Sequence, residues 1–169
     1  MHPNDKIVSS LNALHQACSE RRRFGEKIIL TSGCFDLVHP GHLEYLCRAR
    51  ELVPEKGPFK GCLVVGVNSD ASVKRLKGPT RPVNSEANRA FVIAGFFPVE
   101  LVAVFDDDLE LINAVRPHIY VASATSKIRI YDDQPRVALL QSHGAVIIEV
   151  DSGKVDSTTA IIGRLAATG

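Results

Sequence analysis

The stretch KIILTSGCFDLVHPGHLEYL, residues 27–46, decides the fold of this chain. Residues 27–31 are mostly apolar and run into a Ser-Gly turn, which predicts a buried β-strand with a tight end. Residues 41–52 then carry three leucines and a cysteine at helical spacing, which predicts a helix with one apolar face. The sequence therefore predicts a strand, a turn and a helix in immediate succession.

The rest of the chain repeats this alternation. Strands are expected at residues 62–68, 101–105, 118–121 and 145–150, and helices at 85–95, 108–115, 134–143 and 157 to about 167. Apolar strands joined by helices indicate a parallel sheet that helices cover on both faces. We predict one α/β domain with a Rossmann-like, doubly wound sheet of five parallel strands. Ligands of such sheets bind where the strand order reverses, which is beside the turn if residues 27–31 form the central strand.

The first residues are expected to form a helix ahead of this domain. Residues 5–23 have apolar side chains at helical spacing, end in three arginines and precede Gly25, a typical helix stop. We therefore divide the chain into an N-terminal helical segment, residues 1–25, and a domain of residues 26–169.

The composition excludes several classes of protein. Of the 169 residues 45% are apolar and 23% charged, and the formal net charge is +1, so neither disorder nor a generally basic nucleic-acid-binding surface is indicated. The four cysteines form no CxxC pair, which argues against a zinc site and a disulfide scaffold. No signal peptide is evident, and no apolar run approaches the roughly 18 residues of a membrane span. We expect a cytoplasmic protein that binds neither membrane nor nucleic acid.

The turn itself has the features of an anion site. Ser32 and Gly33 let the backbone approach a ligand closely, and the helix that begins near Gly41 directs its free N–H groups to the same place. His39 and His42, three residues apart across the helix start, can both add donors there. A lone histidine here would more often cap the helix or pack in the core, but this pair beside Gly33 favours a binding role.

A second group of cations borders the same cleft. Residues 74–82 are read as a basic loop after the second strand, followed by a helix that Asn84 caps. A solvated basic face is the alternative to an anion site here, and the arginine of the next helix is either a further cation at the site or a surface residue. The cations are Lys74, Arg75, Lys77, Arg81 and Arg89.

Other reactive residues receive structural interpretations. Asp106 to Asp108 and the pair Asp132–Asp133 each precede a helix and are expected to cap it rather than to bind a metal. Cys34 is interpreted as a small residue lining the turn, because no Cys/His/Asn framework supports a nucleophile. Neither a Walker A pattern nor GxGxxG occurs, which argues against a P-loop kinase and an NAD dehydrogenase.

Cations at a helix N-terminus, without a nucleophile or general base, suit transfer at a phosphate whose attacker is already an anion. A phosphate ester attacks the α-phosphorus of a nucleoside triphosphate (NTP), and pyrophosphate leaves. Mg²⁺ is expected to travel with the NTP, held largely by phosphate and water oxygens, so no metal site built from side chains is predicted.

Four motifs in order carry a resemblance to a known family. GCFDLVHPGH (residues 33–42) resembles the HxGH signature of the nucleotidyltransferase superfamily that includes the cytidylyltransferases. VNSDASVKRLKGPTRPVN (67–84), SEANRAFVIAGF (85–96) and DSTTAIIGRL (156–165) extend the resemblance. Within the superfamily the chain looks most like the D-glycero-β-D-manno-heptose 1-phosphate adenylyltransferases, which make ADP-heptose for lipopolysaccharide biosynthesis.

The resemblance implies roles for individual residues. The catalytic residues, which would contact the phosphates, are His39, His42, Lys77 and Arg89. The nucleotide-binding residues are Ser32, Gly33, Cys34, Phe35, Asp36 and Gly41, with Ser157, Thr158 and Thr159 at the β or γ phosphate. The residues facing the acceptor are Asn68, Asp70 and Arg81.

The implied reaction is transfer of AMP from ATP to a sugar 1-phosphate, heptose 1-phosphate by the resemblance, with release of pyrophosphate. One departure keeps alternatives open, because VASATSKIRIYDD (residues 121–133) stands where the heptose enzymes carry a KGGDY-like stretch. The alternatives are a CTP-dependent transferase acting on glycerol 3-phosphate or another polyol phosphate, and a nucleotide-binding module without transfer activity. The resemblance also suggests a homo-oligomer.

Overall fold

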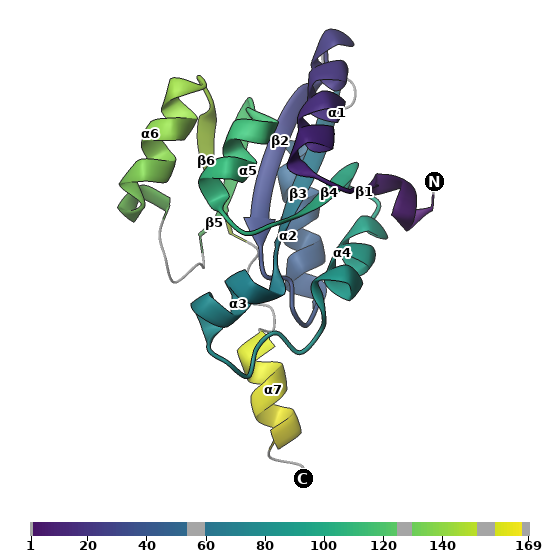
Figure 1. The fold of residues 1–169 in the computed structure, drawn as a ribbon, viewed down its shortest axis with the longest axis vertical. Coiled ribbons are helices and arrows are strands. Elements are labelled where there is room, and N and C mark those ends of the chain that lie inside the picture. The colour runs from purple at the N-terminus through teal and green to yellow at the C-terminus, as the bar shows by residue number, and fades with distance from the viewer. Residues whose placement is uncertain (1, 54–59, 125–129, 152–157, 167–169) are drawn as a thin grey trace.

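A computed structural model describes residues 2–53, 60–124, 130–151 and 158–166. Its centre is one sheet of six parallel strands in the order β1-β4-β3-β2-β5-β6 (Figure 1). The strands are β1 (Ile7–Val8), β2 (Lys27–Gly33), β3 (Gly61–Asn68), β4 (Leu101–Phe105), β5 (Ile119–Ser123) and β6 (Val146–Val150).

Helices cover both faces of the sheet. They are α1 (Leu11–Arg23), α2 (Pro40–Glu51), α3 (Asp70–Lys77), α4 (Glu86–Ala94), α5 (Asp108–Val115), α6 (Gln134–Ser142) and α7 (Thr158–Ala166), with short 3-10 turns η1 (Pro3–Lys6) and η2 (Ile130–Asp132). Helices α1, α5 and α6 pack on one face, and α2 and α4 on the other. Helices α3 and α7 lie beyond the carboxyl ends of the strands (Figure 1). The predicted doubly wound α/β architecture is confirmed.

The sheet has one strand more than predicted. Ile7 and Val8, expected in the N-terminal helix, form β1 and pair with Val102 and Ala103 of β4. The helix begins only after Ser10, whose Oγ accepts the N–H of Ala13. The β-branched pair also fits the apolar period of α1, so the helical pattern concealed a strand that forms because β4 lies beside it.

Two expectations for the chain after β3 were also wrong. Residues 74–77, expected in a basic loop of residues 74–82, form the end of helix α3, which Ser69 caps by accepting the N–H of Ser72 at 3.0 Å. The glycine and prolines that suggested a loop begin only at Gly78. Ser85, not Asn84, is the N-cap of α4, and its Oγ accepts the N–H of Asn88.

β3 is buried along its whole length, and its close packing requires a glycine. A Cβ added at Gly66 would lie 2.4 Å from Cδ2 of Leu111 and 3.0 Å from Cε1 of Phe105. Helix α5 therefore approaches the sheet more closely at this point than any side chain would permit.

The strand order reverses at β2, as predicted. β3 and β4 follow on one side of it, and β5 and β6 on the other. The turn after β2 therefore adjoins the carboxyl end of β5, the position where open α/β sheets bind ligands. No helix in the described part of the chain is both long and apolar enough to cross a membrane.

Candidate active site

Residues 33–42, here called the α2 turn, bring the two predicted histidines together. Pro40 occupies the first position of α2, where its fixed φ suits the helix and its missing N–H costs nothing. His39 is the N-cap residue and His42 lies in the first turn, with ring centroids 4.0 Å apart. The backbone N–H of His39 donates to Nδ1 of His42 at 3.4 Å. Both imidazoles therefore lie at the positive end of the α2 dipole.

His42 is a neutral donor in the unliganded protein. Burial, and next the proximity of His39, lower the pKa of His42 to about 4. Since Nδ1 accepts a backbone N–H, the proton of the neutral ring resides on Nε2. The ring thus offers an N–H to an anion, and an arriving negative charge raises its pKa.

Phe35 supports the His42 ring from within the turn. Its φ is +46°, in the left-handed region, and its ring meets His42 edge to face with centroids 5.3 Å apart. The ring also occupies the space beside Gly33, where an added Cβ would lie 3.1 Å from Cε2 of Phe35. Gly33 therefore lets the Phe35 ring pack closely against the backbone, and a larger residue would have to displace that ring slightly.

The Asp36 carboxylate is bound inside the protein. It is 2% exposed and accepts the N–H groups of Val83 and Asn84 at 2.8 and 2.9 Å and Nε of Arg81 at 2.5 Å. Burial alone would raise the pKa of Asp36, but these donors outweigh it and hold the pKa below its ordinary value. Asp36, predicted to contact the nucleotide, and Arg81, predicted to contact the acceptor, therefore bind each other. Together with the N–H groups of residues 83 and 84, this ion pair joins the α2 turn to residues 81–84.

Arg89 is also engaged with protein acceptors. Its side chain is fully buried, Nε donates to the carbonyl of Asn84 at 2.9 Å, and one terminal nitrogen to that of Cys34 at 2.6 Å. The other terminal nitrogen pairs with Asp70 Oδ1 at 2.8 Å. The N–H of Asp70 in turn donates to the Glu86 carboxylate at 2.7 Å.

Lys77, the last residue of α3, differs from these arginines. It is exposed and has no hydrogen bond or ion pair with another residue that the structure describes. Burial raises the pKa of the Cys34 thiol, while the charges of Lys77, Arg89 and Arg81 oppose that rise. Three segments of the chain thus bring positive charge to the α2 turn, and Lys77 is the member without a partner among the described residues.

The hydrogen bonds that join Ser32 to α5 and β5 were not predicted from the sequence. Ser32 Oγ donates to Asp108 Oδ1 at 3.2 Å, and Asp108 pairs with Arg136 at 2.8 Å. The Tyr120 hydroxyl lies 3.4 Å from Ser32 Oγ. Asp108 was predicted as a cap, and no local signal indicated its pairing with a residue 28 positions away. Ser32, a predicted nucleotide contact, therefore directs its side chain to Asp108 of α5 and Tyr120 of β5.

The remaining predicted residues are placed as follows. Asn68, at the end of β3, is buried and donates from Nδ2 to Ser72 Oγ at 3.0 Å. Gly41 is buried in the first turn of α2. Thr158 and Thr159 begin α7. Ser157 lies outside the described residues, as do residues 125–129 of the stretch 121–133 that differs from the KGGDY-like sequence.

Of the acidic residues predicted as caps, Asp107 and Asp133 cap helices, whereas Asp106 accepts the Ser69 hydroxyl and Asp108 pairs with Arg136. Asp107 accepts the N–H groups of Leu109 and Glu110 at 2.8 and 3.0 Å, and Asp133 accepts that of Arg136 at 3.2 Å. Within the described ranges, no three His, Cys, Asp or Glu side chains gather to hold a metal ion.

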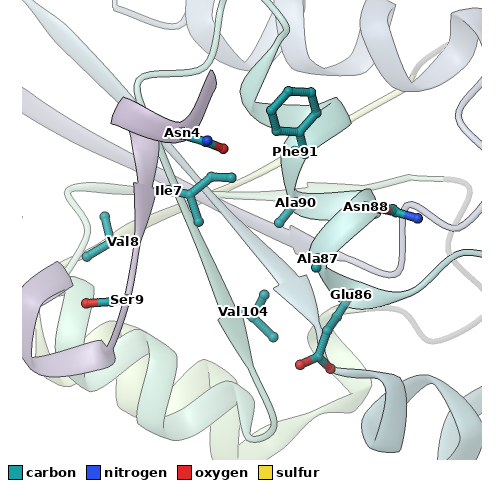
Figure 2. Close-up of a pocket in the computed structure, with 10 residues that line it drawn as sticks. All are labelled: Asn4, Ile7, Val8, Ser9, Glu86, Ala87, Asn88, Ala90, Phe91 and Val104. Carbon is teal, nitrogen blue, oxygen red and sulfur yellow. The ribbon is translucent and has the colours of Figure 1, made fainter. Parts of the chain in front are cut away.

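Two pockets differ in their relation to these residues. One of about 580 Å³ lies under the α2 turn, lined by Phe35, Asp36 and Val38 together with Arg89 of α4 and Ile161 of α7. The other, of about 510 Å³, lies between β1 and α4 and is lined by none of the predicted site residues (Figure 2). Neither histidine lines the pocket under the α2 turn, but Phe35, whose ring contacts His42, does.

Comparison with known proteins gives a consistent result. A family model described as cytidylyltransferase-like matches residues 30–164. The "Bifunctional protein HldE" of Paramagnetospirillum magneticum is 42% identical over 162 residues, which cover 95% of this chain and 31% of that protein. Its namesake in Campylobacter jejuni is 50% identical over 107 residues, which cover 62% of this chain and 22% of that protein. The chain thus spans about a third or less of these relatives.

Solved structures share the fold. The "lipopolysaccharide core biosynthesis protein" of Thermoplasma volcanium superposes with a TM-score of 0.61 at 24% identity, covering 78% of this chain and all of that one. A protein "with unknown function" from Archaeoglobus fulgidus gives 0.55 at 18% identity, with coverages of 78% and 93%. At such identities the likeness concerns the architecture alone.

Proposed function

Because the chain belongs to the cytidylyltransferase-like family, we propose that it is a nucleotidyltransferase that moves AMP from ATP to the phosphate of a sugar 1-phosphate, with heptose 1-phosphate as the acceptor. The observation that carries the proposal is the contact between the His39 and His42 rings at the N-terminus of α2, beside the reversal of strand order. The motif resemblance and the HldE relatives support ATP and the heptose.

The chemistry needs donors rather than a base. An oxygen of the acceptor phosphate, already an anion, forms a bond to the α-phosphorus, and the bond from that phosphorus to the oxygen bridging to the β-phosphate breaks. Negative charge grows on the phosphoryl oxygens and on the departing pyrophosphate. In this proposal that charge is neutralised by His42 Nε2–H, His39, the free N–H groups of α2 and the Lys77 ammonium. The protein thus acts by positioning and charge stabilisation.

Magnesium enters this proposal as part of the substrate. Imidazoles and an ammonium group do not form the oxygen cage that Mg²⁺ prefers, and the described residues offer no acidic cluster in its place. The NTP therefore carries the ion on its phosphate oxygens.

The other predicted contacts complete the proposal. The backbone from Ser32 to Asp36 and Gly41 would line the nucleotide, and Ser157 to Thr159, at the start of α7, would meet the β or γ phosphate. The acceptor would lie at the carboxyl edge of the sheet, between the ends of β3 and β5, where it would face Asn68 at the end of β3.

A panel of substrates tests the proposal. ATP, CTP, GTP and UTP are each combined with heptose 1-phosphate, other sugar 1-phosphates and glycerol 3-phosphate, and pyrophosphate release is measured. We expect turnover with ATP and heptose 1-phosphate. Turnover confined to CTP with a polyol phosphate would replace the proposed substrates, and nucleotide binding without turnover on any acceptor would reject the transferase activity.

A further inference from the structure

Arg89 is the largest fully buried side chain among the residues that the structure describes. It extends from α4 and bonds to three separate segments: the carbonyl of Cys34 in the α2 turn, the carbonyl of Asn84 before α4, and the carboxylate of Asp70 on α3. A buried guanidinium is retained only where such acceptors satisfy it.

We infer that Arg89 is a positioning residue for the proposed transfer reaction, because its buried guanidinium fixes the backbone at Cys34 and thereby holds Phe35 against His42. The inference rests on the proposed function and differs from the role that the family resemblance implies, which is direct contact with phosphate. A positioning role and phosphate binding make opposite demands on the side chain.

The burial and the bonds of Arg89 oppose phosphate binding. A guanidinium has five N–H donors in a rigid planar fork, and here each of its three nitrogens already donates to a protein acceptor. The side chain exposes none of its surface. To meet a phosphate it would have to give up its ion pair with Asp70 and its hydrogen bonds to two partly buried carbonyls. Lys77, exposed at the end of α3, has no such constraint.

The link from Arg89 to His42 passes through Phe35. A residue other than glycine holds a positive φ only where its surroundings enforce it. Arg89 binds the carbonyl just before Phe35, and the N–H groups of Val83 and Asn84 bind the Asp36 carboxylate just after it. Bracketed on both sides, Phe35 keeps φ at +46° and its ring on the edge of His42. The orientation of a donor imidazole thus depends on a buried arginine that need not touch the substrate.

The first test compares Arg89→Ala with Arg50→Ala. Arg50 is a matched control, because it is also largely buried and bonds to a carboxylate and a carbonyl, Glu100 at 3.0 Å and Val53 at 3.0 Å, at the other end of β3. We expect Arg89→Ala to lower kcat by about tenfold to a hundredfold while KM for ATP changes by less than about threefold. Arg50→Ala should leave kcat near that of the wild type.

Chemical rescue makes the test specific. Arg89 is among the residues that line the pocket of about 580 Å³, and truncation of its buried side chain leaves a void beside that pocket that can take a small ion. We expect guanidinium chloride, at concentrations that leave the protein folded, to restore most of the lost kcat, and ammonium chloride at equal ionic strength not to do so. A rise in KM for ATP at unchanged kcat would assign Arg89 to phosphate binding. If Arg89→Ala and Arg50→Ala lowered kcat equally and guanidinium restored neither, Arg89 would contribute only to the stability of the fold.

A measurement without substrate keeps the two proposals separable. Hydrogen exchange of residues 33–42 should be faster in Arg89→Ala than in the wild type, with β3 unchanged. If Arg89→Ala does not fold, Asp70→Asn weakens one anchor, leaves Arg89 in place and should show the same acceleration to a smaller degree. Unchanged exchange in the α2 turn overturns the positioning role, whereas a wild type that turns over no substrate overturns the proposed function.

Discussion

The α2 turn and the α3–α4 segment, residues 70–89, both bring nitrogen donors to the carboxyl edge of the sheet, but they use them differently. In the α2 turn a backbone N–H satisfies Nδ1 of His42, which leaves the proton on Nε2 for a ligand. In the α3–α4 segment, Arg81 and Arg89 bind Asp36 and Asp70. Those arginines pair with carboxylates of the protein, and in our proposal Arg89 holds segments of the site together rather than binding a ligand.

The largest effect is expected for Asp36→Ala, which removes the acceptor that joins the two regions. It leaves Arg81 and two backbone N–H groups without their partner, so the free energy of unfolding should fall by about 3 kcal/mol. Urea denaturation measures the loss. Asp132→Ala, an exposed control, should change stability by less than about 0.5 kcal/mol.

The same carboxylate gives a pH dependence. The pKa of Asp36 is lower in the folded than in the unfolded protein, so its stabilisation is complete above about pH 4 and is lost as the pH falls toward the folded pKa. The wild type should therefore lose more stability than Asp36→Ala over that acidic range. Parallel pH profiles of the two proteins would show that the carboxylate does not join the regions as described.

His39→Ala tests the α2 turn itself. If the imidazole stabilises the charge that develops in the transition state, kcat should fall by about a hundredfold or more, with a much smaller change in ATP affinity. Steady-state kinetics and nucleotide binding separate the two quantities. His15→Ala, on the exposed side of α1, serves as the control, and an unchanged kcat in His39→Ala would reject the role.

Lys77→Ala tests whether the α3–α4 segment contributes a ligand-binding cation. Loss of one exposed ammonium group near the phosphates should lower kcat/KM by about tenfold, and the deficit should shrink as salt screens the remaining charges. Lys74→Ala is the control, because Lys74 is also an exposed lysine of α3. Of these two lysines, Lys77 is the one whose charge opposes the rise in the pKa of the Cys34 thiol. Equal losses in both variants would indicate a general basic surface instead of a phosphate contact.

The two regions also differ in how far the sequence predicts them. β4 and α5 were placed to the residue, because an apolar run and the Asp107 cap are contiguous signals. The histidine pair was predicted for the same reason, since its strand, turn and helix are adjacent. The bonds of the α3–α4 segment join residues far apart, 45 positions for Arg81 to Asp36 and 55 for Arg89 to Cys34. From residue type alone, Arg89 could therefore be interpreted either as a cation at the site or as a surface residue, and its burial could not be predicted.

Short elements that depend on neighbours were missed. β1 consists of two residues whose strand conformation follows from pairing with β4. α3 has eight residues and was hidden by the breakers that follow it, although Ser69 carried the signal of a cap. Such elements are stabilised by tertiary contacts more than by local pattern.

The smallest expected effect is a change in the pKa of His42 on nucleotide binding, and its comparison with His118 gives the most specific test of the α2 turn. Burial lowers the pKa of both His42 and His118. Nδ1 of His118 accepts the N–H of Ile28 at 2.9 Å, at the amino end of β2, whereas His42 lies at the carboxyl end, where we place the triphosphate. A non-hydrolysable ATP analogue should raise the pKa of His42 from about 4, because negative charge favours the imidazolium, and leave that of His118 unchanged. NMR titration of the imidazole resonances with and without the analogue measures both. A shift at His118, or none at His42, would place the bound nucleotide away from the α2 turn, because the Coulombic effect of a phosphate decays over about 10 Å at ordinary ionic strength.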